Sequence, residues 1–159
     1  MRTLIVYDSY FGNTETVAQE IGKSLGSPKG VEVCKVKEVT PEQLKGLNIL
    51  IVGSPTRAFS PSPAIKKFLK SIPNDSLKGI RVAAFDTRIA PKDIDSKILS
   101  FLVKLFGYAA LPILKKLVKK GGKQVIAPEG FIVTDTEGPL KEGELERASA
   151  WAGQIEGAG

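Results

Sequence analysis

Polar residues gather between Ser9 and Thr14, in a stretch that reads Ser-Tyr-Phe-Gly-Asn-Thr. It joins an apolar run to a segment with helical spacing. Gly12 lets the backbone turn closely around a ligand, and the N–H groups at a helix N-terminus attract anions. Each hydrogen bond to a charged group contributes roughly 1.5–3 kcal/mol, so several donors together can hold an anion without Lys or Arg. The sequence therefore predicts a phosphate site at Ser9, Tyr10, Phe11, Gly12, Asn13 and Thr14.

Two further segments place polar residues directly after an apolar run. In an open α/β sheet, ligands bind at the carboxyl ends of the strands, so such segments meet at one edge. With residues 9–14 as the first segment, the second comprises Ser54, Pro55, Thr56, Arg57, Ala58 and Phe59, and the third is the loop Phe85, Asp86, Thr87 and Arg88. Phe59 either stacks on a ligand ring or packs against the following helix. We expect both segments to contact the ligand held by residues 9–14.

The composition excludes several kinds of chemistry. The chain has no His and a single Cys, Cys34, so it holds no His-based triad, none of the usual zinc sites and no C-x-x-C redox pair. The alternatives are carboxylate or hydroxyl chemistry, a bound cofactor, or no catalysis, and we identify no catalytic side chain and no metal site. A single Cys fits a reducing compartment, and the apolar run at 4–7 is too short for a signal-peptide core, so we expect a cytoplasmic protein.

Three other phosphate-related motifs of α/β proteins are absent from the sequence. Gly22-Lys23-Ser24 resembles the end of a P-loop, but Val17 stands where the first Gly of that motif belongs. No G-x-G-x-x-G follows the first apolar run, so the dinucleotide fingerprint is missing. Gly53-Ser54-Pro55 occupies the place where a phosphoacceptor receiver would carry an acidic residue.

Hydrophobic periodicity predicts strands that alternate with helices. Short apolar or alternating runs predict strands at 3–7, 31–36, 47–52 and 80–85, with 31–36 at the edge. A weaker pair, 124–127 and 131–134, predicts the last strand, interrupted by Pro128 and Gly130. Apolar residues three and four apart predict helices at 14–25, 64–72 and 142–155. The expected fold class is α/β: a doubly wound five-stranded parallel sheet with helices on both faces, formed by one domain over residues 1–159.

Residues 91–121 hold more apolar residues than one helix needs. We expect Gly107 to separate two helices, and the lysines at 97, 104, 115 and 116 exclude a membrane-spanning helix. Either both helices pack on the core, or residues 94–118 leave apolar surface for a homodimer or another partner.

The chain is basic. Its 23 Lys and Arg against 17 Asp and Glu give a net charge of +6, so we expect partners with acidic surfaces. Lysines form two clusters with helical spacing: Lys66, Lys67 and Lys70, and then Lys115, Lys116, Lys119, Lys120 and Lys123. The alternative is that both clusters are solvated helix faces. Nucleic acid is disfavoured as a partner, because aromatic residues are few and no nucleic-acid motif occurs.

Residues 4–22 resemble the phosphate loop of the flavodoxin family and the helix that follows it. They read Leu-Ile-Val-Tyr-Asp-Ser-Tyr-Phe-Gly-Asn-Thr-Glu-Thr-Val-Ala-Gln-Glu-Ile-Gly. Residues 51–57 are similar to the loop that covers one face of the isoalloxazine ring in that family, and 85–88 take the place of the loop at the pyrimidine edge. The resemblance implies FMN as the cofactor, bound by these three segments, and electron transfer between redox partner proteins as the function.

The chain departs from the family pattern at two of these segments. Flavodoxins usually carry a Thr where this chain has Phe11, so one hydroxyl donor is lost. Many have an acidic and aromatic segment where this chain has Asp86 beside Arg88. A guanidinium of Arg57 or Arg88 about 4–8 Å from the reduced, anionic flavin would stabilise it by roughly 2–4 kcal/mol at an effective dielectric near 20, and the flavin would then be less strongly reducing. The alternative is that Arg88 pairs with Asp86 as structural support.

Two other functions are compatible with these residues. An FMN-dependent NAD(P)H:quinone-type oxidoreductase would share the fold, but it needs an open substrate pocket and commonly forms oligomers. A non-redox interaction module would keep the fold and use the basic surface to bind an acidic protein. Electron transfer through a bound flavin is favoured, because it requires neither His nor Cys from the protein.

Overall fold

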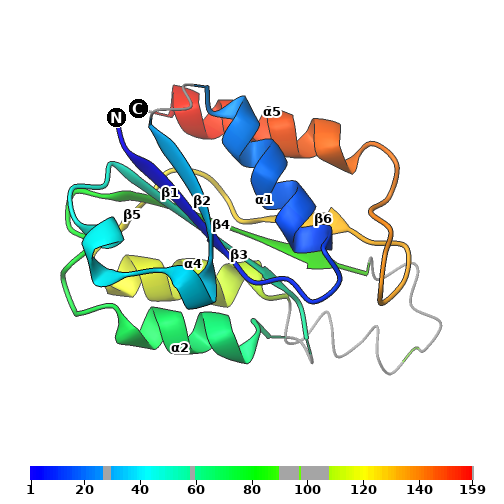
Figure 1. Cartoon of the computed structure of the whole chain (residues 1–159), viewed down its shortest axis with the longest axis horizontal. Coiled ribbons are helices and arrows are strands. Elements are labelled where there is room, and N and C mark those ends of the chain that lie inside the picture. The colour runs from blue at the N-terminus through cyan, green and yellow to red at the C-terminus, as the bar shows by residue number, and fades with distance from the viewer. Residues whose placement is uncertain (27–29, 58–59, 90–96, 98–107, 159) are drawn as a thin grey trace.

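A parallel β-sheet forms the middle layer of the protein (Figure 1). The computed structural model describes residues 1–26, 30–57, 60–89, 97 and 108–158. The strands are β1 (Thr3–Tyr7), β2 (Val31–Lys35), β3 (Ile49–Pro55), β4 (Arg81–Arg88), β5 (Lys123–Gln124) and β6 (Glu129–Ile132). The first four lie in the order β2-β1-β3-β4, and every neighbouring pair is parallel. The predicted edge position of the second strand is therefore confirmed.

β5 and β6 together fill the fifth position of the sheet. β5 pairs with the start of β4 at Arg81 and Val82, whereas β6 pairs with its end at residues 85–88. Pro128 lies between β5 and β6 and has no N–H to donate to a neighbouring strand. The predicted five-stranded parallel sheet is confirmed, with its last strand interrupted where the sequence indicated.

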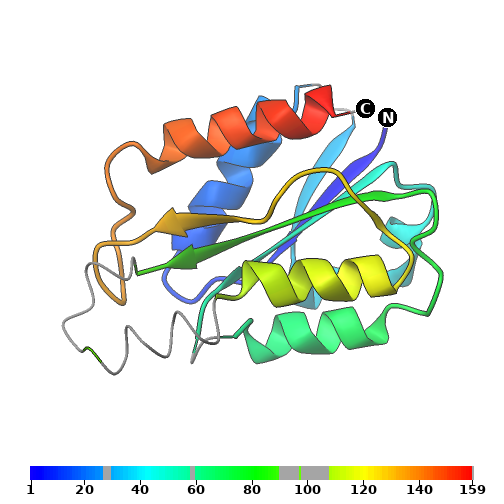
Figure 2. The same ribbon diagram turned by 180° about the vertical axis from the view of Figure 1, so that it is seen from behind.

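Helices cover both faces of the sheet (Figures 1 and 2). Those in the described residues are α1 (Asn13–Ser24), α2 (Pro63–Ser71), α4 (Ala110–Lys119) and α5 (Glu144–Gly157). α1 and α5 pack side by side on one face, and α2 and α4 pack side by side on the other. Two short 3-10 helices, η1 (Val36–Glu38) and η2 (Pro41–Leu44), connect β2 to β3. This arrangement confirms the predicted doubly wound fold.

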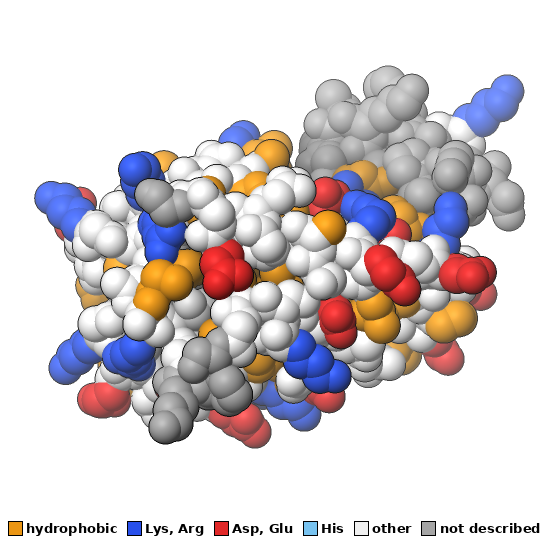
Figure 3. Space-filling model, turned by 90° about the horizontal axis from the view of Figure 1, so that it is seen from above, with side chains coloured by type: hydrophobic (Ala, Val, Ile, Leu, Met, Phe, Trp, Pro, Cys, Tyr) orange, Lys and Arg blue, Asp and Glu red, His pale blue; other side chains and the backbone are white. Residues whose placement is uncertain are grey.

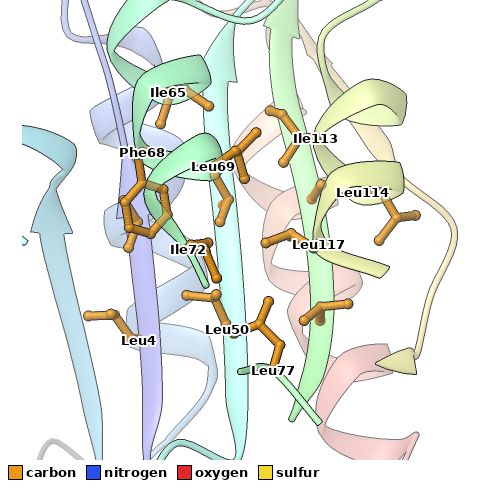
Figure 4. Packing of buried hydrophobic residues seen from close by; sticks show 14 of the residues in the cluster. Leu4, Leu50, Ile65, Phe68, Leu69, Ile72, Leu77, Ile113, Leu114 and Leu117 are labelled. Atoms are coloured by element: carbon orange, nitrogen blue, oxygen red, sulfur yellow. The ribbon is translucent and has the colours of Figure 1, made fainter. Parts of the chain in front are cut away.

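Alternate residues of the strands fill two separate cores, because successive side chains of a strand point to opposite faces. Leu4 and Leu50 pack with the apolar faces of α2 and α4 (Figure 4). Ile5 and Ile51 pack with α1 and α5 on the other side. Fully burying such a side chain contributes roughly 1.5–3 kcal/mol. The two cores hold the strands from both sides and so fix the carboxyl edge of the sheet.

The end of β4 corrects one prediction. Residues 85–88 were expected to form a loop, but they continue the strand to Arg88. The reason is that β3 and β6 run beside this segment and pair with it from both sides. The first and second segments do follow β1 and β3, although β3 extends through Pro55.

The second half of the unusual apolar stretch forms α4. Ile113, Leu114 and Leu117 are buried in the core beneath this helix, whereas Leu111 and Val118 are 47% and 43% exposed. The helix predicted before Gly107, and Gly107 itself, lie outside the described residues. In the part of the chain that the structure describes, no helix is both long and apolar enough to cross a membrane.

Candidate functional site

A hollow of about 240 Å³ opens at the carboxyl edge of the sheet, where β1, β3 and β4 end. Its lining comes from all three predicted segments and from one more: Ser9, Tyr10, Phe11, Asn13, Thr14, Pro55, Thr56, Arg57, Thr87, Arg88, Ile89, Val133 and Thr136. Its described residues include two arginines and neither Asp nor Glu. The structure thus brings the three segments together around a hollow that favours an anion.

Three of the predicted site residues that the structure describes are not part of that lining. Gly12 contributes the backbone turn behind it, and the side chains of Ser54 and Asp86 are fully buried. Ala58 and Phe59 lie outside the described residues, so stacking of Phe59 on a ligand ring stays a prediction.

Sequence reasoning missed Ile89, Val133 and Thr136. Val133 and Thr136 follow β6 and reach the hollow because β6 pairs with the end of β4. Thr136 belongs to a polar Thr-Asp-Thr run directly after the last apolar segment. That run is the sequence signal that could have indicated it, because polar residues after a strand also marked the other three segments.

The turn at Gly12 presents the N-terminus of α1 to the hollow. Gly12 is the N-cap of α1 with φ 90°, a left-handed conformation that other residues adopt only with strain. The Ser9 hydroxyl accepts a hydrogen bond from the Gly12 N–H at 3.0 Å, which holds the turn closed. No side chain of the described residues caps the helix. The first N–H groups of α1 are therefore left for an anion.

The side chains of Asn13 and Thr14 also make contacts within the protein. The Asn13 amide donates to the Glu137 carbonyl at 3.1 Å, which ties the loop to the segment after β6. The Thr14 hydroxyl is buried and lies 2.8 Å from the Thr87 hydroxyl, which joins α1 to the end of β4. A hydroxyl both donates and accepts, so Thr14 can accept from Thr87 and still donate to an anion.

The end of β3 is braced by its own hydroxyl groups. The buried Ser54 hydroxyl accepts from the Ser62 N–H at 2.9 Å and donates to the Pro55 carbonyl at 2.8 Å. The Thr56 hydroxyl accepts from the Ala109 N–H at 3.2 Å, beside the start of α4. Ser54 therefore supports the second segment from behind, and Thr56 reaches both the hollow and α4.

Arg88 is paired with a buried carboxylate. Its Nε and one terminal nitrogen donate to the two Asp86 oxygens at 2.6 and 2.7 Å, and the Ala110 N–H donates to the same carboxylate at 2.9 Å. The guanidinium lies over the Tyr108 ring, 3.8 Å from its centre. Burial raises the pKa of the Asp86 carboxyl, while the Arg88 guanidinium opposes that rise. This geometry agrees with the interpretation that Arg88 pairs with Asp86 as structural support.

Arg57 occupies a different electrostatic environment. Its guanidinium lies 4.4 Å from the centre of the Tyr10 ring and 5.9 Å from that of Phe11. Both rings are nearly half exposed. Among the described residues, no carboxylate forms an ion pair with Arg57. The positive charge at the mouth of the hollow is therefore mainly that of Arg57.

A second hollow of about 660 Å³ lies at the opposite, amino edge of the sheet. Its walls are mostly apolar and include Val39, Leu44 and Phe68. No α-helix N-terminus is part of its lining, so it lacks the backbone donors of the site at Gly12. The hollow at the carboxyl edge is therefore the candidate site for an anionic ligand, although it is the smaller of the two.

Known proteins share a family model and the fold with this chain. A model of the flavodoxin domain family matches residues 4–124, which is more than half of the chain. Flavodoxin 2 from Bacillus cereus is 24% identical, with a TM-score of 0.76 over 98% of this chain and 97% of that chain. A flavodoxin from the domain Archaea is 21% identical, with a TM-score of 0.73 over 99% and 97%.

A further likeness is to part of a larger protein. The rubredoxin oxygen:oxidoreductase of Desulfovibrio gigas is 18% identical, with a TM-score of 0.73 over 99% of this chain and 35% of that chain. At these identities, the solved structures show that the fold is shared. No curated protein sequence matches the chain.

Proposed function

Because the chain belongs to the flavodoxin family, we propose that it binds FMN at the carboxyl edge of the sheet and passes electrons between redox partner proteins. The observation that carries this proposal is the N-terminus of α1: among the described residues, no side chain caps it, and the hollow on which it opens is lined by two arginines and no carboxylate. Bound FMN would supply the redox chemistry, because its flavin ring accepts and donates electrons.

The phosphate would be held by residues 9–14. The N–H groups at the start of α1 are the principal donors, and the hydroxyls of Ser9 and Thr14 add to them. Phe11 offers only its backbone N–H, since it has no hydroxyl where the family usually has one. The Asn13 amide would keep the loop in place through its bond to Glu137.

The flavin ring would be bound by the second and third segments. The volume of about 240 Å³ is below the roughly 300–1,000 Å³ of common small-molecule sites, so FMN would not be fully enclosed by the described residues. We propose that Pro55, Thr56, Arg57, Ala58 and Phe59 contact the ring on one side, and that Thr87 and Arg88 contact its edge. Asp86 would act indirectly, by holding Arg88 in place.

The remaining parts of the proposal concern the whole chain. We propose that residues 1–159 act as a single flavodoxin-like domain that works as an electron carrier. The single Cys34 supports a reducing cytoplasm as its compartment. The net charge of +6 supports redox partners with acidic surfaces.

Two N-cap glycines provide a matched test of the phosphate site. Gly12 and Gly143 have nearly the same backbone angles, with φ 90° and 92°, and a Cβ on either would meet no atom within 4 Å. An Ala at φ near +90° is strained by about 1–2 kcal/mol. In Gly12→Ala the free loop relaxes, and binding must restore the strained turn, so FMN affinity should fall roughly 5- to 30-fold. Gly143→Ala, at the start of α5, should leave FMN affinity unchanged.

FMN binding is measured by quenching of flavin fluorescence as apoprotein is added. No binding by the wild type would refute the proposal, and an equal loss in the two variants would refute the assignment of the phosphate to Gly12. Steady NAD(P)H-to-quinone turnover by the loaded protein without a partner reductase would favour the oxidoreductase over the electron carrier.

A further inference from the structure

The two lysine clusters of the sequence lie on the same face of the molecule. α2 carries Lys66, Lys67 and Lys70, α4 carries Lys115, Lys116 and Lys119, and all six are exposed. The two helices contain no Asp or Glu, and they lie side by side over one side of the sheet (Figures 1 and 2). We call the outer surface of α2 and α4 the lysine face.

The opposite face of the sheet has a different charge. α1 and α5 together carry five Glu against one Lys and one Arg. Figure 3 views the molecule from this side and shows acidic side chains among the basic ones. The net charge of the two helix pairs is therefore +6 for α2 and α4 and −3 for α1 and α5. Of these four helices, the two basic ones therefore lie together on one side of the sheet.

Helix stability does not account for this arrangement. Lys66 and Lys70, like Lys115 and Lys119, are four residues apart, and like charges at this spacing destabilise a helix. In the described part of the chain, no ion pair involves any of the six lysines. Six exposed lysines on two helices that contain no Asp or Glu are complementary to an acidic surface outside the chain.

Two exposed apolar residues lie among these lysines. Leu111 and Val118 are 47% and 43% exposed, and they are seven residues apart on α4, so they share one side of the helix. Lys115 stands between them at a spacing of four and three residues. A protein interface has an apolar core and a polar rim. A partner surface with an apolar patch surrounded by carboxylates would therefore be complementary to Leu111 and Val118 and the lysines around them.

The lysine face also reaches the proposed FMN site. The start of α4 is bonded to Thr56 of that site through the Ala109 N–H, and to Asp86, which holds Arg88 of that site, through the Ala110 N–H. Ala110 to Lys119 spans about 14 Å at 1.5 Å per residue. A partner that covers α4 would therefore have one end beside the mouth of the hollow, as electron exchange requires.

We propose that the lysine face is the docking surface for an acidic redox partner protein, with Leu111 and Val118 as its apolar contacts. This inference rests on the proposed function and adds the surface on which the partner binds. A nucleic acid is a poorer match, since α2 and α4 have no Arg and no exposed aromatic residue. An anionic membrane is also a poorer match, because two separate aliphatic side chains do not form the continuous apolar face of an interfacial helix.

The test compares two charge-reversal variants of the full chain. Lys70→Glu with Lys119→Glu changes the lysine face, and Lys23→Glu with Lys141→Glu makes the same change of net charge at exposed sites elsewhere. The probe is a fluorescent 20-residue peptide of Glu and Leu, followed by anisotropy at two salt concentrations. We expect its dissociation constant to rise at least tenfold in the first variant and less than twofold in the second.

Backbone amide NMR shifts on peptide addition should be largest in α2, α4 and the adjoining edge of the hollow. An equal weakening in both variants would overturn the proposal, because net charge alone would then explain binding. Tighter binding to anionic phosphatidylglycerol vesicles or to a 30-base-pair DNA duplex, lost in the first variant only, would also overturn it. If circular dichroism shows that the variant Lys70→Glu with Lys119→Glu does not fold, the variant Lys70→Gln with Lys119→Gln replaces it.

The peptide assay needs no flavin, so its outcome is separate from that of the proposed function. If the wild type binds the peptide but not FMN, the proposed FMN function is refuted and the docking surface stands. Retained FMN binding with no peptide binding by the wild type would refute the docking surface alone.

Discussion

The pair Asp86–Arg88 allows a quantitative test of how the site is held together. The Asp86 side chain is fully buried and accepts three hydrogen bonds, two from Arg88 and one from the Ala110 N–H. The Arg88 side chain is 22% exposed and also lies on the Tyr108 ring. The perturbation is Asp86→Asn, Arg88→Met and the two changes together.

The expected cost depends on which partner is left behind. Arg88→Met leaves a carboxylate out of reach of water with one backbone donor, and breaking a buried pair in this way costs about 3–5 kcal/mol of unfolding free energy. Asp86→Asn leaves a guanidinium that is already partly hydrated, so we expect the loss of charged hydrogen bonds alone, about 1–3 kcal/mol. The double variant should be no less stable than Arg88→Met, so the coupling energy should at least equal the cost of Asp86→Asn, about 1 kcal/mol or more.

The pH dependence of Arg88→Met has a definite sign. In the unfolded chain the pKa of Asp86 is near 3.9, whereas burial raises the pKa in the folded protein. Removing Arg88 removes the cation that opposes this rise. Between the two pKa values the folded variant binds a proton that the unfolded chain lacks, so its stability falls as the pH increases. The deficit relative to wild type should therefore be larger at pH 8 than at pH 5.

Urea unfolding of the flavin-free proteins, followed by far-UV circular dichroism at both pH values, measures all four free energies. Costs of the two single changes that add to within about 0.5 kcal/mol would refute the coupling. A larger cost for Asp86→Asn than for Arg88→Met would refute the reasoning that the buried, unpaired carboxylate dominates.

Two further predictions concern the ring site and its support. Arg57→Gln should make the bound flavin more strongly reducing than Arg88→Gln does, because Asp86 already neutralises the charge of Arg88. The Coulomb energy between a guanidinium and the reduced flavin 4–8 Å away is about 2–4 kcal/mol. A potentiometric titration measures the flavin potential, and equal shifts of that potential in the two variants would contradict this prediction. Gly53→Ala should cost about 3 kcal/mol or more, because its Cβ would lie 2.1 Å from the Phe85 ring. The control Gly153→Ala, in open space on α5, should raise thermal stability slightly; similar melting temperatures for the two variants would contradict the packing argument.

Local sequence determined the strand, turn and helix at residues 3–24. Residues 4–7 are apolar enough to be buried on both faces, and apolar residues such as Val17 and Ile21 recur at helical spacing. Gly12 permits the left-handed turn between the two elements. These are properties of neighbouring residues, so this strand, turn and helix could be predicted without any distant contact.

Pairing between distant segments decided the rest of the site. Residues 85–88 resembled a loop because Asp86 and Arg88 are charged, but β3 and β6 pair with them and make them a strand. The charge of Arg88 is balanced only because the strand geometry places residues two apart on the same side. Val133 and Thr136 likewise reach the hollow only through β6.

The same distinction applies to the lysines. The sequence identified two clusters at helical spacing and left open whether they are solvated faces or a binding surface. The clusters come together because α2, which follows β3, and α4, which follows β4, cover the same face of the sheet. Spacing along the chain fixes which side of a helix a residue occupies, whereas the side of the sheet that a helix covers depends on the whole topology.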